Sequence, residues 1–162
     1  MLGSGRVNLL AKLKEYFGGK PEPEHLRRGK LGERAARRYL KDQGLKFLTA
    51  NYRSERGEID LVFRDRSPMG GRSMVHANEG DCLVFVEVKT RSSEAWTRPA
   101  SAVNAAKRRR ISRTALDYLR ELDEPRVKVR FDIVEVLLAA GEVREVRHLP
   151  CAFQLSAPYR HG

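Results

Sequence analysis

The fold is decided by two short segments, Gly57-Glu58-Ile59-Asp60-Leu61-Val62 and Leu83-Val84-Phe85-Val86-Glu87-Val88-Lys89. Both are rich in β-branched residues, which favours β-strands. Side chains alternate between the two faces of a strand, so Glu87 and Lys89 share a face, and the valines between and before them share the other. Charged groups in so apolar a run need partners, which pairing of the strands would supply by bringing Asp60 near Glu87 and Lys89. The two segments therefore predict a cluster of two carboxylates and a lysine, a candidate divalent-metal site.

The sequence around these segments predicts an α/β fold. Residues 25–41 carry an apolar stripe at helical spacing, which Gly44 ends. Residues 45–53 predict a strand before the two quoted segments, and residues 127–138 and 143–149 predict two more strands after a second helix. The order α-β-β-β-α-β-β predicts a mixed sheet flanked by helices. The stripes of the two helices are Leu31, Ala35, Tyr39 and Leu40 in the first, and Ile111, Ala115, Tyr118, Leu119 and Leu122 in the second.

The pattern also predicts how the chain is divided. Residues 1–23 read as an amphipathic N-terminal arm and a linker rich in Gly and Pro. Residues 24–155 form the predicted domain, and residues 156–162 a tail. Residues 65–81 break every periodicity with Pro and Gly, which predicts a mobile loop between the second and third strands.

The charge of the chain is unevenly distributed. The 162 residues carry a net charge of +11 and have a pI of about 10.1. Residues 25–41 hold seven Lys or Arg and one acid, residues 98–122 hold seven and two acids, and the rest of the chain is neutral. Two basic helices therefore carry the excess, which favours a polyanionic partner, most simply DNA.

Other classes of protein fit the sequence less well. The two cysteines have neither paired spacing nor a histidine cluster, so a zinc site and a disulfide framework are both unsupported. Cys82 and Cys151 each adjoin an apolar run and are expected to be buried thiols. No apolar stretch approaches the ~20 residues needed to span a bilayer, so we expect no membrane partner and a cytoplasmic location.

The carboxylates predict metal-assisted phosphodiester cleavage. Mg²⁺ or Mn²⁺ takes oxygen ligands, and one or two carboxylates suffice for each ion. Asp60 and Glu87 are expected to bind the metal, with the backbone carbonyl of Val88 as a further oxygen. Glu33, from the first helix, would hold a second ion or the water of the first, and Lys89 would orient the attacking water or offset charge in the transition state. The alternatives are a structural ion pair at Lys89 and, for Glu33, a favourable interaction with the helix dipole.

The basic helices supply most of the candidate phosphate contacts, for which the alternative is a solvated helix face, and Arg91, two residues after Lys89, adds one more. These are Arg27, Arg28, Arg91, Lys107, Arg108, Arg109, Arg110 and Arg113, together with Arg37 and Arg38.

In combination, three sets of residues resemble the YraN family. They are Gly29-x-x-Gly32-Glu33-x-x-Ala36-x-x-Tyr39-Leu40, then Asn51-x-Arg53-x-x-x-Gly57-Glu58-Ile59-Asp60-Leu61, then Val84-Phe85-Val86-Glu87-Val88-Lys89-x-Arg91. The family consists of small predicted bacterial endonucleases that are similar to archaeal Holliday-junction resolvases, in the restriction-endonuclease-like, PD-(D/E)xK class. The resemblance implies that fold, and it implies that Glu33, Asp60, Glu87 and Lys89 occupy the active-site positions. Two features depart from the family pattern: Ala95-Trp96-Thr97 replaces an aromatic-glycine pair, and loop 65–81 is longer than usual.

Two functions remain open from the sequence. The first is a metal-dependent DNA endonuclease, acting on substrates that include branched or repair-intermediate DNA. The second is a nucleic-acid-binding protein of the same fold that cuts nothing. A homodimer is plausible, because related resolvases place two cuts symmetrically.

Overall fold

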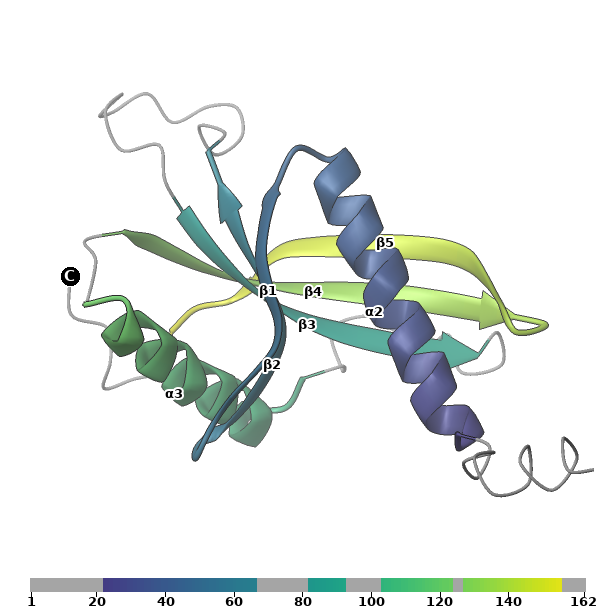
Figure 1. Cartoon of the computed structure of the whole chain (residues 1–162), viewed down its shortest axis with the longest axis horizontal. Coiled ribbons are helices and arrows are strands. Elements are labelled where there is room, and N and C mark those ends of the chain that lie inside the picture. The colour runs from purple at the N-terminus through teal and green to yellow at the C-terminus, as the bar shows by residue number, and fades with distance from the viewer. Residues whose placement is uncertain (1–21, 67–81, 93–102, 124–126, 156–162) are drawn as a thin grey trace, which may run out of the picture.

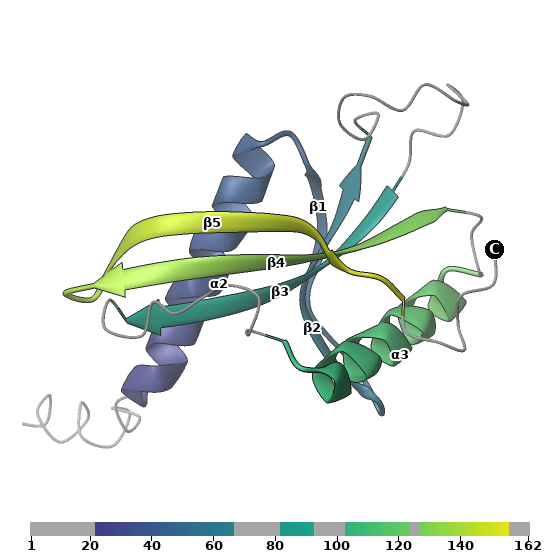
Figure 2. The same cartoon turned by 180° about the vertical axis from the view of Figure 1, so that it is seen from behind.

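The computed structural model describes residues 22–66, 82–92, 103–123 and 127–155. Within these residues, a five-stranded mixed sheet is covered by one helix on each face (Figures 1 and 2). The predicted order α-β-β-β-α-β-β is confirmed. The elements are α2 (Glu24–Asp42), β1 (Lys46–Ser54), β2 (Gly57–Asp65), β3 (Cys82–Ser92), α3 (Ala105–Glu121), β4 (Lys128–Ala139) and β5 (Glu142–Phe153).

The strands lie in the order β1-β2-β3-β4-β5, so sequence neighbours are also spatial neighbours. β3 and β4 run parallel, and the other neighbouring pairs are antiparallel. A parallel pair needs a crossover connection, and here that connection contains α3. The parallel register places Lys89 beside Glu135, a pairing that becomes important at the candidate site.

Helix α2 packs against the face formed by Val84 and Val86 of β3, and in Figure 1 it crosses in front of β3, β4 and β5. Its buried residues are Gly32, Ala36 and Leu40. The buried face of α2 is therefore displaced by about one residue from the predicted stripe, of which Leu31, Ala35 and Tyr39 are only partly buried. A Cβ atom at Gly32 would lie 1.8 Å from Thr90 Oγ1, so only glycine allows the helix to approach β3 this closely.

Helix α3 packs on the opposite face against Phe85, through Ile111 and Ala115. The face is rich in aromatic contacts: the rings of Phe85 and Phe131 stack at 5.7 Å between centroids, and those of Phe131 and Phe153 at 4.9 Å. The predicted stripe extended too far, because Leu122 is 45% exposed. It follows the last helical residue, where the chain no longer faces the sheet.

A buried polar network joins β2, β4 and β5 at the end of the sheet away from the β1–β2 turn. Asp132 is fully buried and accepts hydrogen bonds from Arg130 Nε at 2.9 Å and from the backbone N–H of Cys151 at 2.9 Å. Its other oxygen lies 2.8 Å from His148 Nε2, and Arg130 Nη1 donates to Asp65 at 2.9 Å. Every charge in this network therefore has a partner, as burial requires.

Several expectations from the sequence need correction or lie outside the described residues. Cys82 is buried as expected, but Cys151 is exposed, at an irregular end of β5 where its φ is 52°. The final strand runs on to Phe153, four residues beyond its predicted end. Residues 1–21 of the N-terminal arm and linker, most of loop 65–81, Ala95-Trp96-Thr97 and the tail fall outside the described residues. Neither α2 nor α3 is long and apolar enough to cross a membrane.

Candidate active site

The candidate site lies where β2 and β3 separate. Their antiparallel ladder reaches Leu61 and Val86 and goes no further in this direction. Just beyond it, Asp60 Oδ2 accepts a hydrogen bond from the backbone N–H of Val88 at 2.6 Å. The Asp60 side chain therefore takes the place of a ladder hydrogen bond and is fixed beside the charged end of β3.

Glu87 provides the second carboxylate, and two lysines contact it. Its Oε1 lies 2.7 Å from Lys89 Nζ and 3.3 Å from Lys107 Nζ, which comes from the first turn of α3. The side chain is only 4% exposed, yet Oε2 has no hydrogen-bond partner among the described residues. An ionised carboxylate oxygen left unpartnered in the interior is costly, so this atom is suited to accept a ligand.

Glu33 comes from α2, and its hydrogen bond is to β1 rather than to Asp60, Glu87 or Lys89. Its Oε2 accepts a hydrogen bond from Asn51 Nδ2 at 3.3 Å. Asn51 lies in β1 with a φ of 53°, a conformation that asparagine tolerates better than most residues. The sequence marked Asn51 only as part of a family pattern, whereas the structure makes it the partner of Glu33.

The carboxylates influence one another through space. The pKa of Asp60 rises from 3.8 to about 7, first because burial removes water and second because the Glu87 charge is close. The Val88 N–H and Lys107 oppose this rise, while Glu33 adds to it. The charges of Glu87 and, more weakly, of Glu33 therefore act on Asp60, although the three acids come from three different elements.

Asp60 and Glu87 are the two residues of this site that could hold a divalent cation. In the described residues, no three His, Cys, Asp or Glu side chains already surround a single point as a metal cage. Two carboxylates, one with a raised pKa and one with an unpartnered buried oxygen, form the kind of pair that a cation stabilises. Mg²⁺ commonly uses only one or two carboxylates and keeps several waters, so a complete protein cage is not required. The N–H of Val88 is used by Asp60, and a role for its carbonyl stays a prediction.

The sequence reading missed a further buried acid, Glu135. It lies next to Lys89 across the parallel ladder, is 1% exposed, and its Oε1 is 3.8 Å from Arg91 Nε. Lys107 of α3, Glu87, Lys89 and Arg91 of β3, and Glu135 of β4 thus form a row of alternating charge. The signal in the sequence was a lone acid inside the apolar run Ile133–Leu138 of β4.

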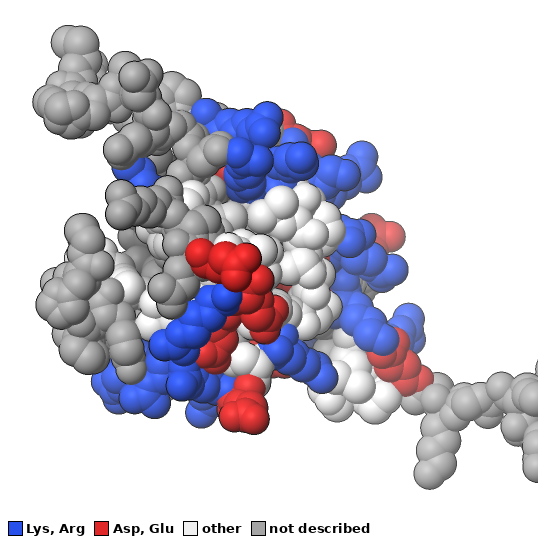
Figure 3. All heavy atoms as spheres, turned by 60° about the vertical axis from the view of Figure 1, so that its left-hand side comes forward, with Lys and Arg blue, Asp and Glu red and all other residues white. Residues whose placement is uncertain are grey.

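The candidate phosphate-binding residues fall into two groups. Arg109, Arg110 and Arg113 on α3 and Arg27, Arg37 and Arg38 on α2 are exposed. Figure 3 shows basic side chains gathered over α2, on the right, and again at the lower left, with acidic and uncharged residues between them.

The remaining candidates have contacts within the protein. Arg108 donates to the Val103 carbonyl at 2.9 Å and lies over the Phe153 ring, and Arg28 lies 4.0 Å from Glu24. Lys107 contacts Glu87, and Arg91 contacts Glu135. Lys107 was predicted as a phosphate contact, but this geometry makes it part of the carboxylate cluster.

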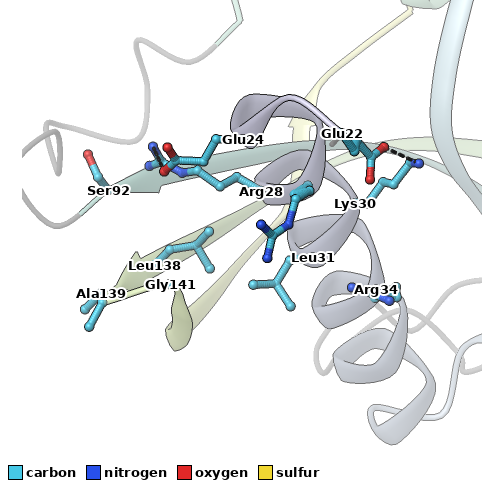
Figure 4. Close-up of a pocket in the computed structure, with 12 residues that line it drawn as sticks. Glu22, Glu24, Arg28, Lys30, Leu31, Arg34, Ser92, Leu138, Ala139 and Gly141 are labelled. Carbon is cyan, nitrogen blue, oxygen red and sulfur yellow. Dashed lines mark ion pairs between the residues drawn. The ribbon is translucent and has the colours of Figure 1, made fainter. Parts of the chain in front are cut away.

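A wide hollow of about 870 Å³ adjoins the N-terminal half of α2 (Figure 4). Its floor includes Leu31 and Leu138, and Lys30 on its rim is ion-paired with Glu22. Arg34 lines this hollow and also a narrower one that contains Glu33. Basic residues of α2 therefore line both hollows, including the one that contains Glu33.

Comparison with known proteins gives a family without an established activity. The family model described as "Uncharacterised protein family UPF0102" matches residues 32–136, which include all four predicted catalytic residues. A UPF0102 protein of Solibacter usitatus is 43% identical over 137 residues, covering 83% of this chain and 92% of that protein. One from Rhodococcus opacus is 39% identical over 125 residues, covering 77% and 94%, respectively. One from Chlorobaculum tepidum is 35% identical over 132 residues, covering 78% and 92%. With a family match across most of the domain and relatives aligned over nearly their whole length, the chain belongs to the UPF0102 family.

Proposed function

We propose that this protein is a metal-dependent DNA endonuclease that hydrolyses phosphodiester bonds. The observation that carries the proposal is the cluster at the β2–β3 separation, in which Asp60 and Glu87 converge beside Lys89 and Lys107. The unpartnered Oε2 of Glu87 and the raised pKa of Asp60 both indicate a site that gains from a bound cation.

Each residue has a role in this proposal. Asp60 and Glu87 would hold Mg²⁺ or Mn²⁺, and Glu33 would bind a second ion or a water of the first. When bound, the metal supplies Lewis-acid polarisation of the scissile phosphate. Lys89, held by Glu87, stabilises the negative charge that develops on the phosphate oxygens.

The basic helices supply the binding energy for the substrate. Exposed arginines of α2 and α3 contact the phosphate backbone, which positions the substrate without reading its sequence. Backbone contacts of this kind are compatible with linear and with branched DNA. The substrate panel below is therefore designed to distinguish these structures.

The test is a cleavage panel of linear, nicked, flapped and four-way DNA with Mg²⁺ or Mn²⁺. We expect cleavage of at least one substrate, and a loss on the order of 10²-fold or more in Asp60→Ala and in Glu87→Ala. Glu142→Ala, which removes an exposed carboxylate on β5, is the matched control and keeps full activity. Folding of each variant is checked by circular dichroism. Cleavage that survives in either site variant contradicts the proposal.

The second candidate function is nucleic-acid binding without cleavage. It is favoured by the pairing of Glu87 with two lysines, which balances the carboxylate charge without a metal. It predicts DNA binding that weakens steeply with salt and no turnover on any substrate in the panel. A homodimer is a proposal under either function, and sedimentation equilibrium at micromolar concentration tests it.

A further inference from the structure

A groove at the β1–β2 turn adjoins the candidate site but had no part in the sequence-based predictions. This hairpin groove has a volume of about 600 Å³ and is lined by Arg53, Arg56, Glu58, Lys107 and Arg110, among others. Lys107 contacts Glu87 at 3.3 Å, so one wall of the groove is also part of the carboxylate cluster.

The structure keeps this groove in place by close packing of the turn against α3. Gly57 has a φ of 153°, and a Cβ atom there would lie 2.7 Å from Cγ of Arg110. Because the residue is glycine, the Arg110 side chain can lie directly against the turn. Arg56 is tied to the same helix through Asp117, at 2.7 Å.

A second, narrower groove lies on the other side of β2, beside α2. This helix groove has a volume of about 200 Å³ and is lined by Lys30, Glu33, Arg34, Arg37 and Asn51, among others. Along β2, the hairpin groove ends at Glu58 and the helix groove ends at Leu61. Asp60 lies between these two positions along β2, where β2 parts from β3, so each groove approaches the candidate site from one face of the sheet.

Both grooves carry more positive than negative charge. The lining of the hairpin groove includes four Lys or Arg and two Glu, and that of the helix groove includes three Lys or Arg and one Glu. The Arg53–Glu58 pair joins side chains that are 76% and 51% exposed, at 3.4 Å. So exposed a pair contributes little to stability, and Arg53 can exchange Glu58 for an anion at little cost.

We propose that the two grooves hold the backbone of one DNA strand, which passes from the helix groove past Asp60 into the hairpin groove. The inference rests on the proposed function and deepens it, because it assigns Arg53 of the hairpin and Arg34 of α2 as phosphate contacts. Cations on both sides of the scissile phosphate fix the strand at two points, which aligns the bond between them with the carboxylates.

The experiment is a methylphosphonate scan, in which one phosphate of a DNA strand at a time is made neutral. Binding is measured by fluorescence anisotropy in EDTA, so that no metal-dependent cleavage is needed. Arg34→Ala tests the helix groove, Arg53→Ala tests the hairpin groove, and Arg144→Ala on β5 is an exposed control. Each groove variant is expected to weaken binding several-fold and to lower the salt slope by about one, unlike the control.

The pattern along the strand decides the inference. Arg34→Ala should abolish sensitivity to neutralisation at one block of phosphates and Arg53→Ala at another block on the same strand. If the strand is cut, the cleaved bond should lie between the two blocks. If both variants affect the same block or different strands, the inference is overturned. The same holds if both variants behave like Arg144→Ala, as they would if an acidic protein were the natural occupant of the grooves.

Failure of this inference is distinguishable from failure of the proposed function. If cleavage needs Asp60 and Glu87 but Arg34→Ala and Arg53→Ala bind DNA like the control Arg144→Ala, only the strand path is overturned. Two separate blocks of phosphates on one strand, with no cleavage of any substrate, support the strand path and overturn the endonuclease.

Discussion

Asp60 ionises in surroundings that favour its neutral form. Burial and the neighbouring Glu87 raise the pKa of Asp60 to about 7, although the Val88 N–H and Lys107 favour the charged form. This arrangement does not stabilise the fold at neutral pH, because burial and the Glu87 charge destabilise the ionised form of Asp60. A residue kept to hold a cation does gain, because the cation relieves the repulsion between the carboxylates.

This conflict predicts how stability depends on pH. Between about pH 4 and pH 7 the unfolded state releases the Asp60 proton while the folded state retains it, so folding stability falls as pH rises. Asp60→Asn removes this loss and should be more stable than the wild type at pH 8 by a few kcal/mol, at about 1.4 kcal/mol per pKa unit. Urea unfolding in EDTA at pH 5 and pH 8 measures both effects.

Addition of Mg²⁺ provides the control for this prediction. At pH 8 the ion should stabilise the wild type and leave Asp60→Asn nearly unchanged, because a ligand stabilises only the state that binds it. Equal stability differences between the two proteins at pH 5 and pH 8 would show that Asp60 titrates as an ordinary surface acid.

At the scale of elements, α2 and the β4–β5 pair position the site in different ways. The approach of α2 to β3 at Gly32 determines where Glu33, the next residue, stands relative to Asp60. The network around Asp132 joins the far ends of β2, β4 and β5, and so fixes the strands that carry Asp60 and Glu135. Packing contacts thus place the acids as much as the site's own hydrogen bonds do.

The helix–sheet contact predicts a coupled pair of substitutions. Gly32→Ala should destabilise the protein by about 1–3 kcal/mol, because its Cβ would overlap with Thr90 Oγ1. Thr90→Gly removes the whole obstructing side chain. Gly32→Ala should therefore cost less stability when it is added to Thr90→Gly than when it is added to the wild type. Gly29→Ala, with nothing within 4 Å of its new Cβ, is the matched control. Additive losses in the double variant would show that the close approach is not the cause.

The buried network predicts a larger loss. Asp132→Ala leaves Arg130 Nε and the Cys151 N–H without this acceptor, although Arg130 Nη1 keeps Asp65, and should cost about 3–5 kcal/mol in the free energy of unfolding. Asp42→Ala, at an exposed position at the end of α2, should change it by less than about 0.5 kcal/mol. Chemical denaturation measures both, and a loss below about 1 kcal/mol for Asp132→Ala would contradict the role of the network.

At the scale of the whole molecule, the exposed arginines form two separate basic regions, one on each helix. The sheet separates α2 from α3, and each helix presents exposed arginines (Figures 1 and 3). The candidate site lies at the strands between them, within reach of both helices through Glu33 and Lys107. The candidate site therefore lies between the two basic regions.

This arrangement predicts a strong dependence of DNA affinity on salt. The logarithm of the affinity should fall by about 0.9 for each neutralised phosphate on duplex DNA, per unit of log salt concentration. Arg109→Ala combined with Arg113→Ala should lower that slope by about two, and Arg144→Ala should leave it unchanged. Titrations at several salt concentrations test this, and an unchanged slope in the double variant would remove α3 from the binding surface.

The sequence by itself determined the order of the elements and the identity of the acids. Period-two alternation located the strands that carry Asp60 and Glu87, and the segregation of arginines identified two basic helices. These features are local, because face alternation and helical periodicity depend on residues only a few positions apart. The same local rule placed the apolar stripe of α2 within one position of its true location.

Only the tertiary structure decided which groups meet. Lys107 was assigned to the helix surface and instead contacts Glu87, and Glu135 became part of the charged row only through the parallel register of β3 and β4. The exposure of Cys151, the pairing of Asn51 with Glu33, and the two grooves on either side of Asp60 were equally out of reach. The physical reason is that register and helix docking are set by packing between segments distant in sequence, which no local pattern records.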